Sequence, residues 1–144
     1  MPQNGFSVGR DVVIRVTTAN GTPLTLTGIT GFHSKPDNTT QRIQMMDGTV
    51  RNLRFPAGWS GSMMVERQGN DLDSYVAQQE AAYYAGGNEL PSSIDETITE
   101  PDGSISQYRY TGVMIQMTDA GDKAGDKTIN QSLSFAASRR LEVL

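Results

Sequence analysis

The stretch DLDSYVAQQEAAYYA at residues 71–85 is the one convincing helix in this sequence, and the segments around it decide the fold. Its first turn carries two aspartates, which suit the helix dipole, and Gly86-Gly87 follows as a stop signal. Apolar residues recur at helical spacing and form a mostly apolar stripe. The stripe consists of Leu72, Tyr75, Val76, Gln79, Ala82 and Tyr83. We expect this stripe to cap a face or an open end of a sheet rather than to bind a cofactor.

Dipeptides typical of tight hairpin turns lie on both sides of the helix, at Asn20-Gly21, Asp47-Gly48 and Asp102-Gly103. Asn-Gly and Asp-Gly tolerate the left-handed backbone that such turns require. Between them apolar and polar residues alternate, as in DVVIRVTT at residues 11–18. The pattern predicts a mainly β protein, an antiparallel β-sandwich or small barrel with one flanking α-helix at about residues 71–85.

Length and composition predict one domain over residues 1–144, with an N-terminal arm at residues 1–10. The chain has no cysteine, which excludes disulfides and thiolate metal sites. Its start, MPQNGFSVGR, lacks the apolar run of a signal peptide, so we expect no export by that route and no membrane partner. Apolar content is 36%, low for a self-contained globule, so part of the apolar surface is expected between subunits.

The sequence contains no recognisable catalytic constellation. His33 is the single histidine and has no nucleophile motif nearby, and DAGDKAGD at residues 119–126 lacks the ordered spacing of a calcium loop. A group of acids at residues 95–102 could supply paired carboxylates, but such a group is more typical of a solvated edge. We therefore predict no catalytic residues, no metal site, no cofactor and no enzymatic activity.

A hairpin is predicted at about residues 41–55, QRIQMMDGTVRNLRF, after a loop at residues 33–40. A two-residue turn at Asp47-Gly48 would set Met45 opposite Val50 and place both on one face with Ile43. Two interpretations of that apolar face remain open: the hairpin folds back onto its own core, or it docks onto a neighbouring subunit.

Taken together, several features resemble tail tube proteins of long-tailed bacteriophages, with contractile-tailed phages the favoured type. They are the N-terminal arm, the hairpin around Met45 to Val50, the segment Trp59-Ser60-Gly61-Ser62, the single helix ending in YYAGG and the late strands. The resemblance spans nearly the whole chain and rests on the order of elements. Related tube subunits occur in type VI secretion.

The resemblance implies hexameric rings that stack into a hollow virion tail tube, assembled in the host cytoplasm, through which DNA is ejected. Implied partners are further copies of the chain and the sheath, baseplate, tape measure and tail terminator proteins. The formal net charge of −4 agrees with a wall that repels DNA in transit. The residues expected at contacts between rings or subunits are Ile43, Met45, Met46, Asp47, Gly48, Val50, Phe55 and Trp59.

Charged residues add two further expectations. Acids that could line the bore are Asp95, Glu96, Glu100, Asp102, Asp119, Asp122 and Asp126, although they could equally decorate the outer surface. Arginines that could pair between subunits are Arg15, Arg109, Arg139 and Arg140.

Two alternatives to the phage tube are open at this point. One is the tube subunit of a secretion or injection system, with the same architecture but protein cargo. The other is a carbohydrate-binding β-sandwich module that uses Trp59, Tyr108 and Tyr110 as a stacking platform.

Overall fold

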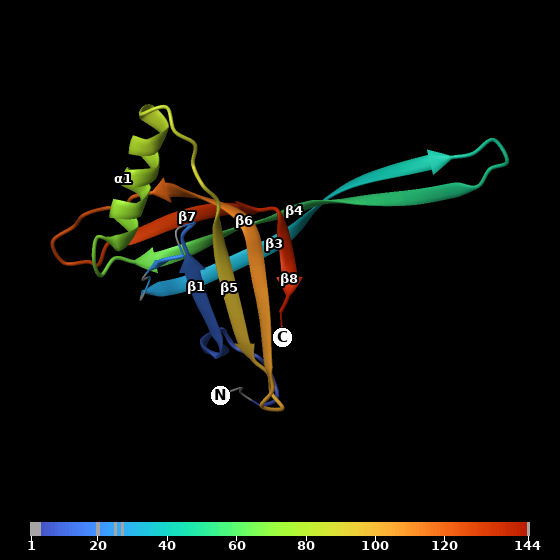
Figure 1. Cartoon of the computed structure of the whole chain (residues 1–144). Helices are drawn as coiled ribbons and strands as arrows, with labels where there is room; N and C mark the ends of the chain where they lie inside the picture. The colour runs from blue at the N-terminus through green and yellow to red at the C-terminus, as the bar shows by residue number, and fades with distance from the viewer. Residues whose placement is uncertain (1–3, 20, 25, 27, 144) are drawn as a thin grey trace.

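The computed structural model describes residues 4–19, 21–24, 26 and 28–143. It is mainly antiparallel β-structure with one α-helix, which confirms the fold class predicted from the sequence (Figure 1). In chain order the elements are η1 (Gly9–Asp11), β1 (Val12–Thr17), β2 (Pro23–Leu24), β3 (Ile29–Gln44), β4 (Val50–Glu66), α1 (Asp71–Tyr84), β5 (Ser92–Thr99), β6 (Ile105–Asp119), β7 (Asn130–Ala137) and β8 (Arg139–Glu142). Residues 1–3 of the expected N-terminal arm and Asn20 of the first predicted turn lie outside the described residues.

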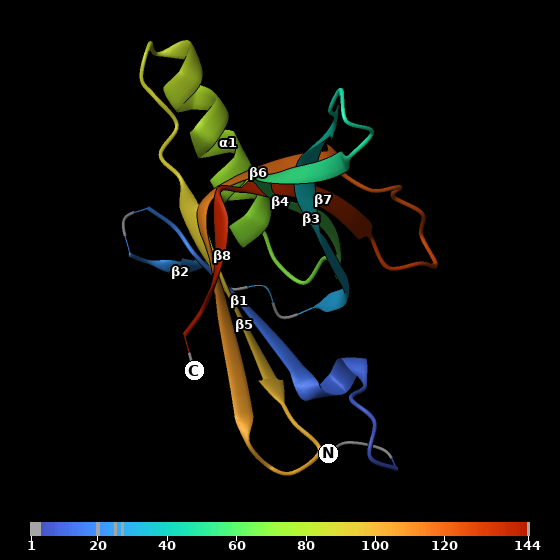
Figure 2. The ribbon, with the colours of Figure 1, turned by 90° about the vertical axis from the view of Figure 1, so that its right-hand side faces the viewer.

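The strands form two groups that share β6. In one group β2, β1, β5 and β6 pair in that order, with β8 also on β6; in the other, β6 is followed by β7, β4 and β3. Figure 2 shows that the two groups run in different directions. Among the described strands, β3 pairs with β4 alone, and β1 pairs with β2 only through Val16 and Thr17. The sheet is therefore not closed, and the edges at β3 and along most of β1 stay open.

The shared strand β6 changes sheets at a glycine. Its first part pairs with β5 as far as Val113, and Met114 begins the pairing with β7. Gly112 lies in the register shift just before this change of partner. It has φ +62°, and a Cβ on it would collide with the Ser138 side chain. Because glycine alone meets both conditions without strain, it allows one strand to turn the corner between the two groups.

The core lies between the two groups of strands. Tyr110 and Ile94 are completely buried, and Met63, Leu133 and Phe135 pack with them. The Phe32 and Phe135 rings stack with centroids 5.5 Å apart, and the Tyr110 ring meets Phe135 edge-on at 5.7 Å. The Tyr110 hydroxyl donates a hydrogen bond to Ser34 at 2.9 Å, and burial raises the pKa of that hydroxyl. These contacts join β3, β6 and β7 into one core.

The helix α1 covers the core only with its first half. Leu72 and Tyr75 are buried, and the hydroxyl of Tyr75 forms a hydrogen bond of 2.7 Å with that of Ser92. Ala82 and Tyr83 are exposed, so the prediction that the whole apolar stripe faces the sheet is wrong for the C-terminal half. The reason is tertiary, because the second half of the helix extends beyond the strands (Figure 1).

The strands β3 and β4 form one long ribbon in place of a short hairpin. Residues 33–40, predicted as a loop, belong to β3, and Trp59 and Gly61 lie within β4. Pro36 is compatible with β3 because an edge strand has one side that needs no backbone donor. The predicted hairpin at residues 41–55 is therefore the outer part of a longer ribbon.

Candidate assembly surface

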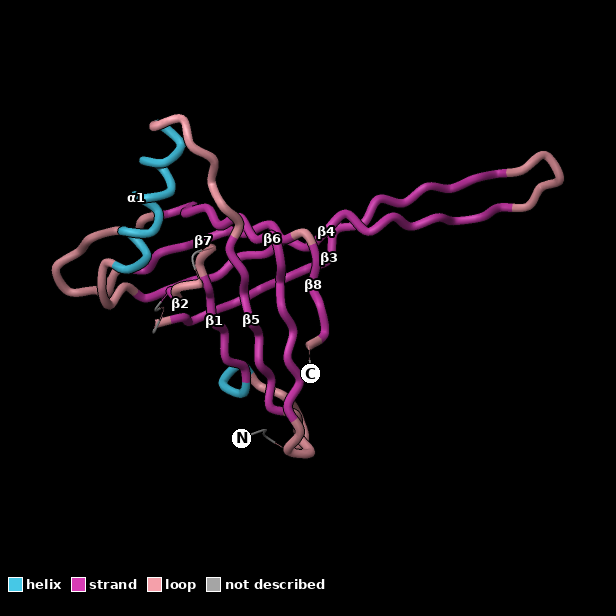
Figure 3. Tube along the Cα trace, viewed as in Figure 1, coloured by secondary structure: helices cyan, strands magenta, loops and turns pink. Residues whose placement is uncertain are grey.

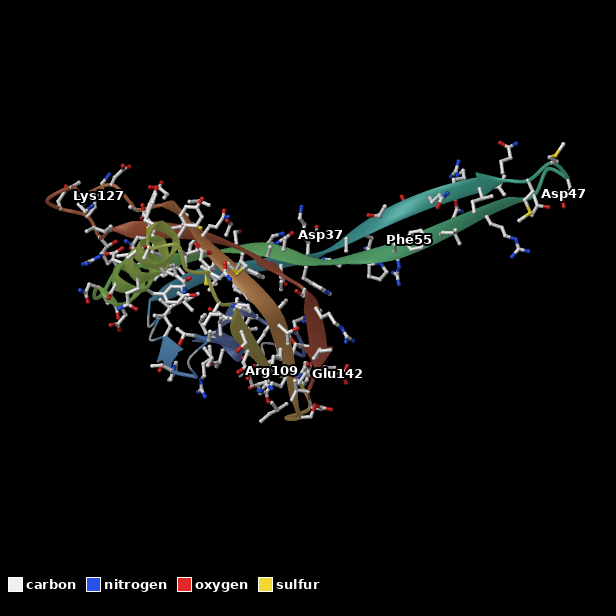
Figure 4. The ribbon with its side chains drawn as sticks, turned by 45° about the horizontal axis from the view of Figure 1, so that its top comes forward. Asp37, Asp47, Phe55, Arg109, Lys127 and Glu142 are labelled. Carbon is white, nitrogen blue, oxygen red and sulfur yellow. The ribbon has the colours of Figure 1, made fainter. Side chains whose placement is uncertain are left out.

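The outer part of the ribbon, residues 38–56, projects away from the body, and we call it the arm (Figure 3). Figure 4 shows Asp47 at its tip, Phe55 midway and Asp37 near its base. At about 3.3 Å per residue, residues 37–44 extend roughly 25 Å. A lone two-stranded ribbon is at best marginally stable in water, so we expect the arm to be covered by another chain.

A register shift marks the place where the arm leaves the body. Pro36 pairs with Trp59 and Asn38 with Pro56, so two residues of β4 oppose one residue of β3. Gly58, in this bulge, has φ +102°, and a Cβ there would lie 2.6 Å from the carbonyl oxygen of Ala137. The bulge bends the ribbon at a point where glycine is required by both backbone conformation and space.

The turn at the tip sets a register that differs from the predicted one. The Met45 amide donates to the Thr49 carbonyl at 2.8 Å, and the Gly48 amide donates to the Met45 carbonyl at 3.0 Å. Gly48 has φ +89°, so this is a three-residue loop with a glycine bulge in place of a two-residue turn. Val50 consequently pairs with Gln44, and the prediction that Val50 pairs with Met45 is wrong.

The observed register places three large apolar side chains on one face of the arm. Directly opposed residues of antiparallel strands point to the same side, and Ile43 pairs with Arg51, Gln41 with Leu53 and Thr39 with Phe55. We call Ile43, Leu53 and Phe55 the apolar arm face; Leu53 is 39% and Phe55 50% exposed. The predicted grouping of Val50 with Ile43 is wrong, because a one-residue shift moves Val50 to the opposite side.

The arm is basic although the whole chain is acidic. Residues 38–56 contain three arginines and one aspartate, whereas the chain has a formal net charge of −4. Arg51 lies on the same side as the apolar arm face, and Arg42 and Arg54 lie on the other. The Thr49 amide donates to Asp47 at 2.9 Å, and this hydrogen bond lowers the pKa of Asp47. The arm therefore carries one negative charge, at its tip, and three positive charges along its strands.

The residues predicted for assembly contacts fall into three places. Met45, Met46, Asp47 and Gly48 form the exposed tip, where Met46 is fully exposed, and Ile43, Val50 and Phe55 lie along the arm. Trp59 is half-buried in the body of the protein, beyond the bulge. Sequence reasoning missed Arg51 and Leu53, although both follow from period-two alternation once the three-residue turn is known.

Trp59, Tyr108 and Tyr110 surround an arginine and do not form an open stacking platform. The Arg140 guanidinium lies 3.8 Å from the Tyr108 ring centroid, 4.9 Å from that of Trp59 and 5.7 Å from that of Tyr110. It also donates to the Glu96 carboxylate at 2.9 Å, and Glu96 is 8% exposed. This cluster joins β4, β5, β6 and β8, and it removes the geometric basis for the carbohydrate-binding alternative.

Two of the arginines expected to pair between subunits are paired within the subunit. Arg140 binds Glu96, and Arg109 donates to Asp95 at 2.9 Å, an interaction that raises the pKa of Arg109. Because each arginine already has a carboxylate partner within the subunit, neither needs a partner from another chain. The same pairs engage the carboxylates of Asp95 and Glu96, and Glu96 is buried.

The other five predicted acids lie at two separate ends of the molecule. Glu100 and Asp102 lie at the β5–β6 turn, where hydrogen bonds from the Ser104 side chain and amide lower the pKa of Asp102. Asp119, Asp122 and Asp126 lie at the β6–β7 connection, at the end marked by Lys127 in Figure 4. The seven acids therefore do not form a single cluster.

An ion pair holds the start of α1, and from it we predict that the stability of the fold depends on pH. Arg67 donates to Asp73 at 2.8 Å and thereby lowers the pKa of Asp73, and Gln131 donates to the other oxygen at 3.0 Å. A lowered folded-state pKa stabilises the ionised protein above the unfolded pKa of about 3.9, and the gain is lost as the pH falls through the folded-state pKa.

Asp73→Asn is therefore expected to lower the free energy of unfolding at pH 7 by at most about 1 kcal/mol, since the pair is partly solvated. Urea titrations at pH 7 and below pH 3 measure this difference, which should shrink at the lower pH. Asp71→Asn, which changes an exposed acid in the same turn, is the matched control. An equal loss of stability for Asp73→Asn at both pH values would contradict the assignment.

No group of three or more potential metal-ligating side chains occurs among the described residues. In the same part of the chain, no helix combines the length and apolar character needed to cross a membrane.

Comparison with known proteins finds solved structures that share the fold of this chain. No family model matches the sequence, and no curated protein matches it significantly. The chain is 9% identical to a PVC sheath/tube terminator of an extracellular contractile injection system, over 91% of this chain and 93% of that chain, with a TM-score of 0.62. The tube-terminating cap of the anti-feeding prophage is 10% identical, and the match covers 90% of this chain and 87% of that chain with a TM-score of 0.62.

A chain from the tail of an empty gene transfer agent particle is 17% identical, and the match covers 95% of this chain and 98% of that chain with a TM-score of 0.58. At these identities the likeness concerns the fold. The protein thus has the fold found in structural components of phage-like tails and contractile injection systems. These solved structures are tail, baseplate and terminator components and not enzymes.

Proposed function

We propose that the protein is a tail tube subunit of a bacteriophage virion, which forms hexameric rings that stack into a conduit for DNA ejection. The observation that carries the proposal is the arm, whose apolar face stays partly exposed among the described residues. A chain of this fold that projects an uncovered ribbon from one end suits head-to-tail stacking, because the contact repeats without closing on itself.

Closure of each ring uses the open strand edges. The outer edge of β3 and the unpaired part of β1 expose backbone donors and acceptors that can pair with a neighbouring subunit. Six copies joined in this way would form a continuous barrel around the bore. Support for six comes from the gene transfer agent tail that shares the fold, which was determined with C6 symmetry.

The charge of the chain suits passage of DNA. The formal net charge is −4, and three of the arginines belong to the arm, which projects from the body. An acidic or neutral wall does not condense on phosphates, so DNA can slide past it. Of the acids predicted for the bore, the proposal keeps Glu100, Asp102, Asp119, Asp122 and Asp126 as candidates.

The further partners of this proposal are the sheath, baseplate, tape measure and tail terminator proteins, with assembly in the host cytoplasm. A second candidate is a subunit of an injection system, either a tube subunit that passes protein cargo or a terminating ring. The likeness to the PVC terminator and to the anti-feeding prophage cap favours this second candidate.

Negative-stain electron microscopy of the purified chain across a concentration series, with light scattering for assembly mass, tests the proposal. Six-fold rings and hollow tubes are expected. Rings that never stack would identify a terminating ring and overturn the tube assignment. A monomer at every concentration would contradict both candidates.

A further inference from the structure

At the C-terminal end of α1 and in the segment after it, large apolar side chains are exposed in the described part of the chain. Tyr83 is 64%, Tyr84 78% and Leu90 56% exposed, and we call these three residues the helix-end patch. The two tyrosine rings meet edge-on with centroids 5.4 Å apart. Two exposed tyrosine rings in mutual contact are typical of a protein contact, where tyrosine is enriched.

Two acidic residues are close to the helix-end patch in sequence. Glu80 precedes Tyr84 by one helical turn and Glu89 directly precedes Leu90, and both acids are exposed. The patch is therefore an apolar surface with a negative rim, whereas the apolar arm face carries the positive charge of Arg51 on the same side. The two surfaces are complementary in both polarity and charge.

The positions of the two surfaces suit contact between copies. The arm projects from one end of the molecule and α1 stands at the other (Figures 1 and 4). An arm cannot reach the helix of its own subunit, but in a head-to-tail row the arm of each copy points toward the α1 end of the next. Both uncovered apolar surfaces would then be buried by a single repeated contact.

The β6–β7 connection lies at the same end and is a weaker acceptor. It offers Asp119, Asp122 and Asp126, but Lys123 and Lys127 lie among these acids. In the described residues 120–129 no large apolar side chain is strongly exposed. An apolar arm face needs an apolar partner to gain from burial, and the helix-end patch provides one.

We propose that the helix-end patch is the receptor for the arm of a second copy, with Ile43, Leu53 and Phe55 packed on Tyr83, Tyr84 and Leu90, and Arg51 near Glu80 or Glu89. This inference rests on the proposed stacking function and assigns the surface that receives the arm. It also assigns a role to the exposed half of α1, which the core does not use.

Disulfide trapping tests the contact directly, because the chain has no cysteine of its own. The double variant Leu53→Cys/Tyr84→Cys, oxidised after assembly of the full chain, is expected to give a ladder of covalently linked copies on a denaturing gel. The matched control, Asn52→Cys/Tyr84→Cys, carries its first thiol on the opposite side of the arm and should give far less. A second comparison, Leu53→Cys/Asp126→Cys, probes the β6–β7 connection.

Two results would overturn the receptor assignment: assembled tubes without a ladder, or a stronger ladder with Asp126→Cys than with Tyr84→Cys. Neither result would contradict the proposed tube function, because tubes would still be visible by electron microscopy. Failure of the unmodified chain to form rings or tubes would instead contradict the proposed function itself.

A charge exchange gives an independent test. Arg51→Glu is expected to raise the concentration needed for tube growth roughly tenfold, and Glu80→Arg/Glu89→Arg should do the same, because like charges then meet. The combined variant should recover most of the loss. The proposed charge pairing would be overturned if Arg51→Glu or Glu80→Arg/Glu89→Arg formed tubes at the same concentration as the unmodified chain. It would also be overturned if the combined variant recovered none of the loss.

Discussion

Leu53→Asp/Phe55→Asp is expected to abolish tube growth and to leave the monomer folded. Both side chains are substantially exposed in the subunit, so charge on them costs little in the isolated chain. In the proposed stack both become buried. Each substitution then loses the burial of the part that is exposed in the subunit, roughly half of the 1.5–3 kcal/mol for a whole side chain, and places an unpaired carboxylate in the contact. Every copy in a ring carries the substitution. The free energy lost at one arm contact is therefore lost at every arm contact between two rings.

Electron microscopy and light scattering measure assembly, and urea denaturation measures the free energy of unfolding. Asn52→Asp/Gln44→Asp is the matched control, since these exposed residues lie on the opposite side of the same arm. Tubes of normal length from Leu53→Asp/Phe55→Asp would contradict the role of the apolar arm face. Loss of tubes from both double variants would show a general effect of charge on the arm rather than one face.

Arg140→Ala is expected to cause the largest loss of monomer stability, about 2–4 kcal/mol, because it leaves the Glu96 carboxylate buried without its partner. The substitution also removes the guanidinium from the Tyr108 and Trp59 rings. The strand β8 should loosen, since Arg140 is its one side chain that reaches both β4 and β5 in the described contacts. Urea denaturation measures the loss.

Three further variants separate the causes. Arg139→Ala removes an exposed neighbour of the same charge and should change stability little. Arg140→Met/Glu96→Gln removes both charges and should recover part of the loss, because no carboxylate is then buried alone. Arg140→Lys keeps the charge but cannot match a planar guanidinium on the rings. An Arg140→Ala chain as stable as Arg139→Ala would contradict the structural role of the cluster.

Local signals in the sequence predicted the elements that depend on local chemistry. Asp47-Gly48 and Asp102-Gly103 both lie at hairpin turns, and both glycines have the positive φ that the dipeptide predicts. The helix predicted at residues 71–85 is observed at Asp71–Tyr84. Alternation identified β1 and predicted a mainly β fold. These features follow from backbone preference and periodicity over a few residues.

Local signals in the sequence did not predict the strand register of the β3–β4 ribbon. Asp47-Gly48 fits a two-residue turn and a three-residue turn equally well in sequence, but the two place Val50 on opposite sides of the ribbon. Residues 33–40, HSKPDNTT, are polar and contain proline, so they resemble a loop. Pairing with β4 makes them a strand, because a neighbouring strand supplies backbone partners that no local signal reports.

The sequence by itself determined the β class, the single helix, the principal turns, the absence of disulfides and the acidic charge, since these depend on residue type and short spacing. Only the tertiary structure decided which side of the arm is apolar and that Arg140 occupies the space between Trp59 and Tyr108. It also decided that Tyr83, Tyr84 and Leu90 stay uncovered. The physical reason is that burial and pairing depend on residues distant in sequence, and each strand meets its partners only when the sheet forms.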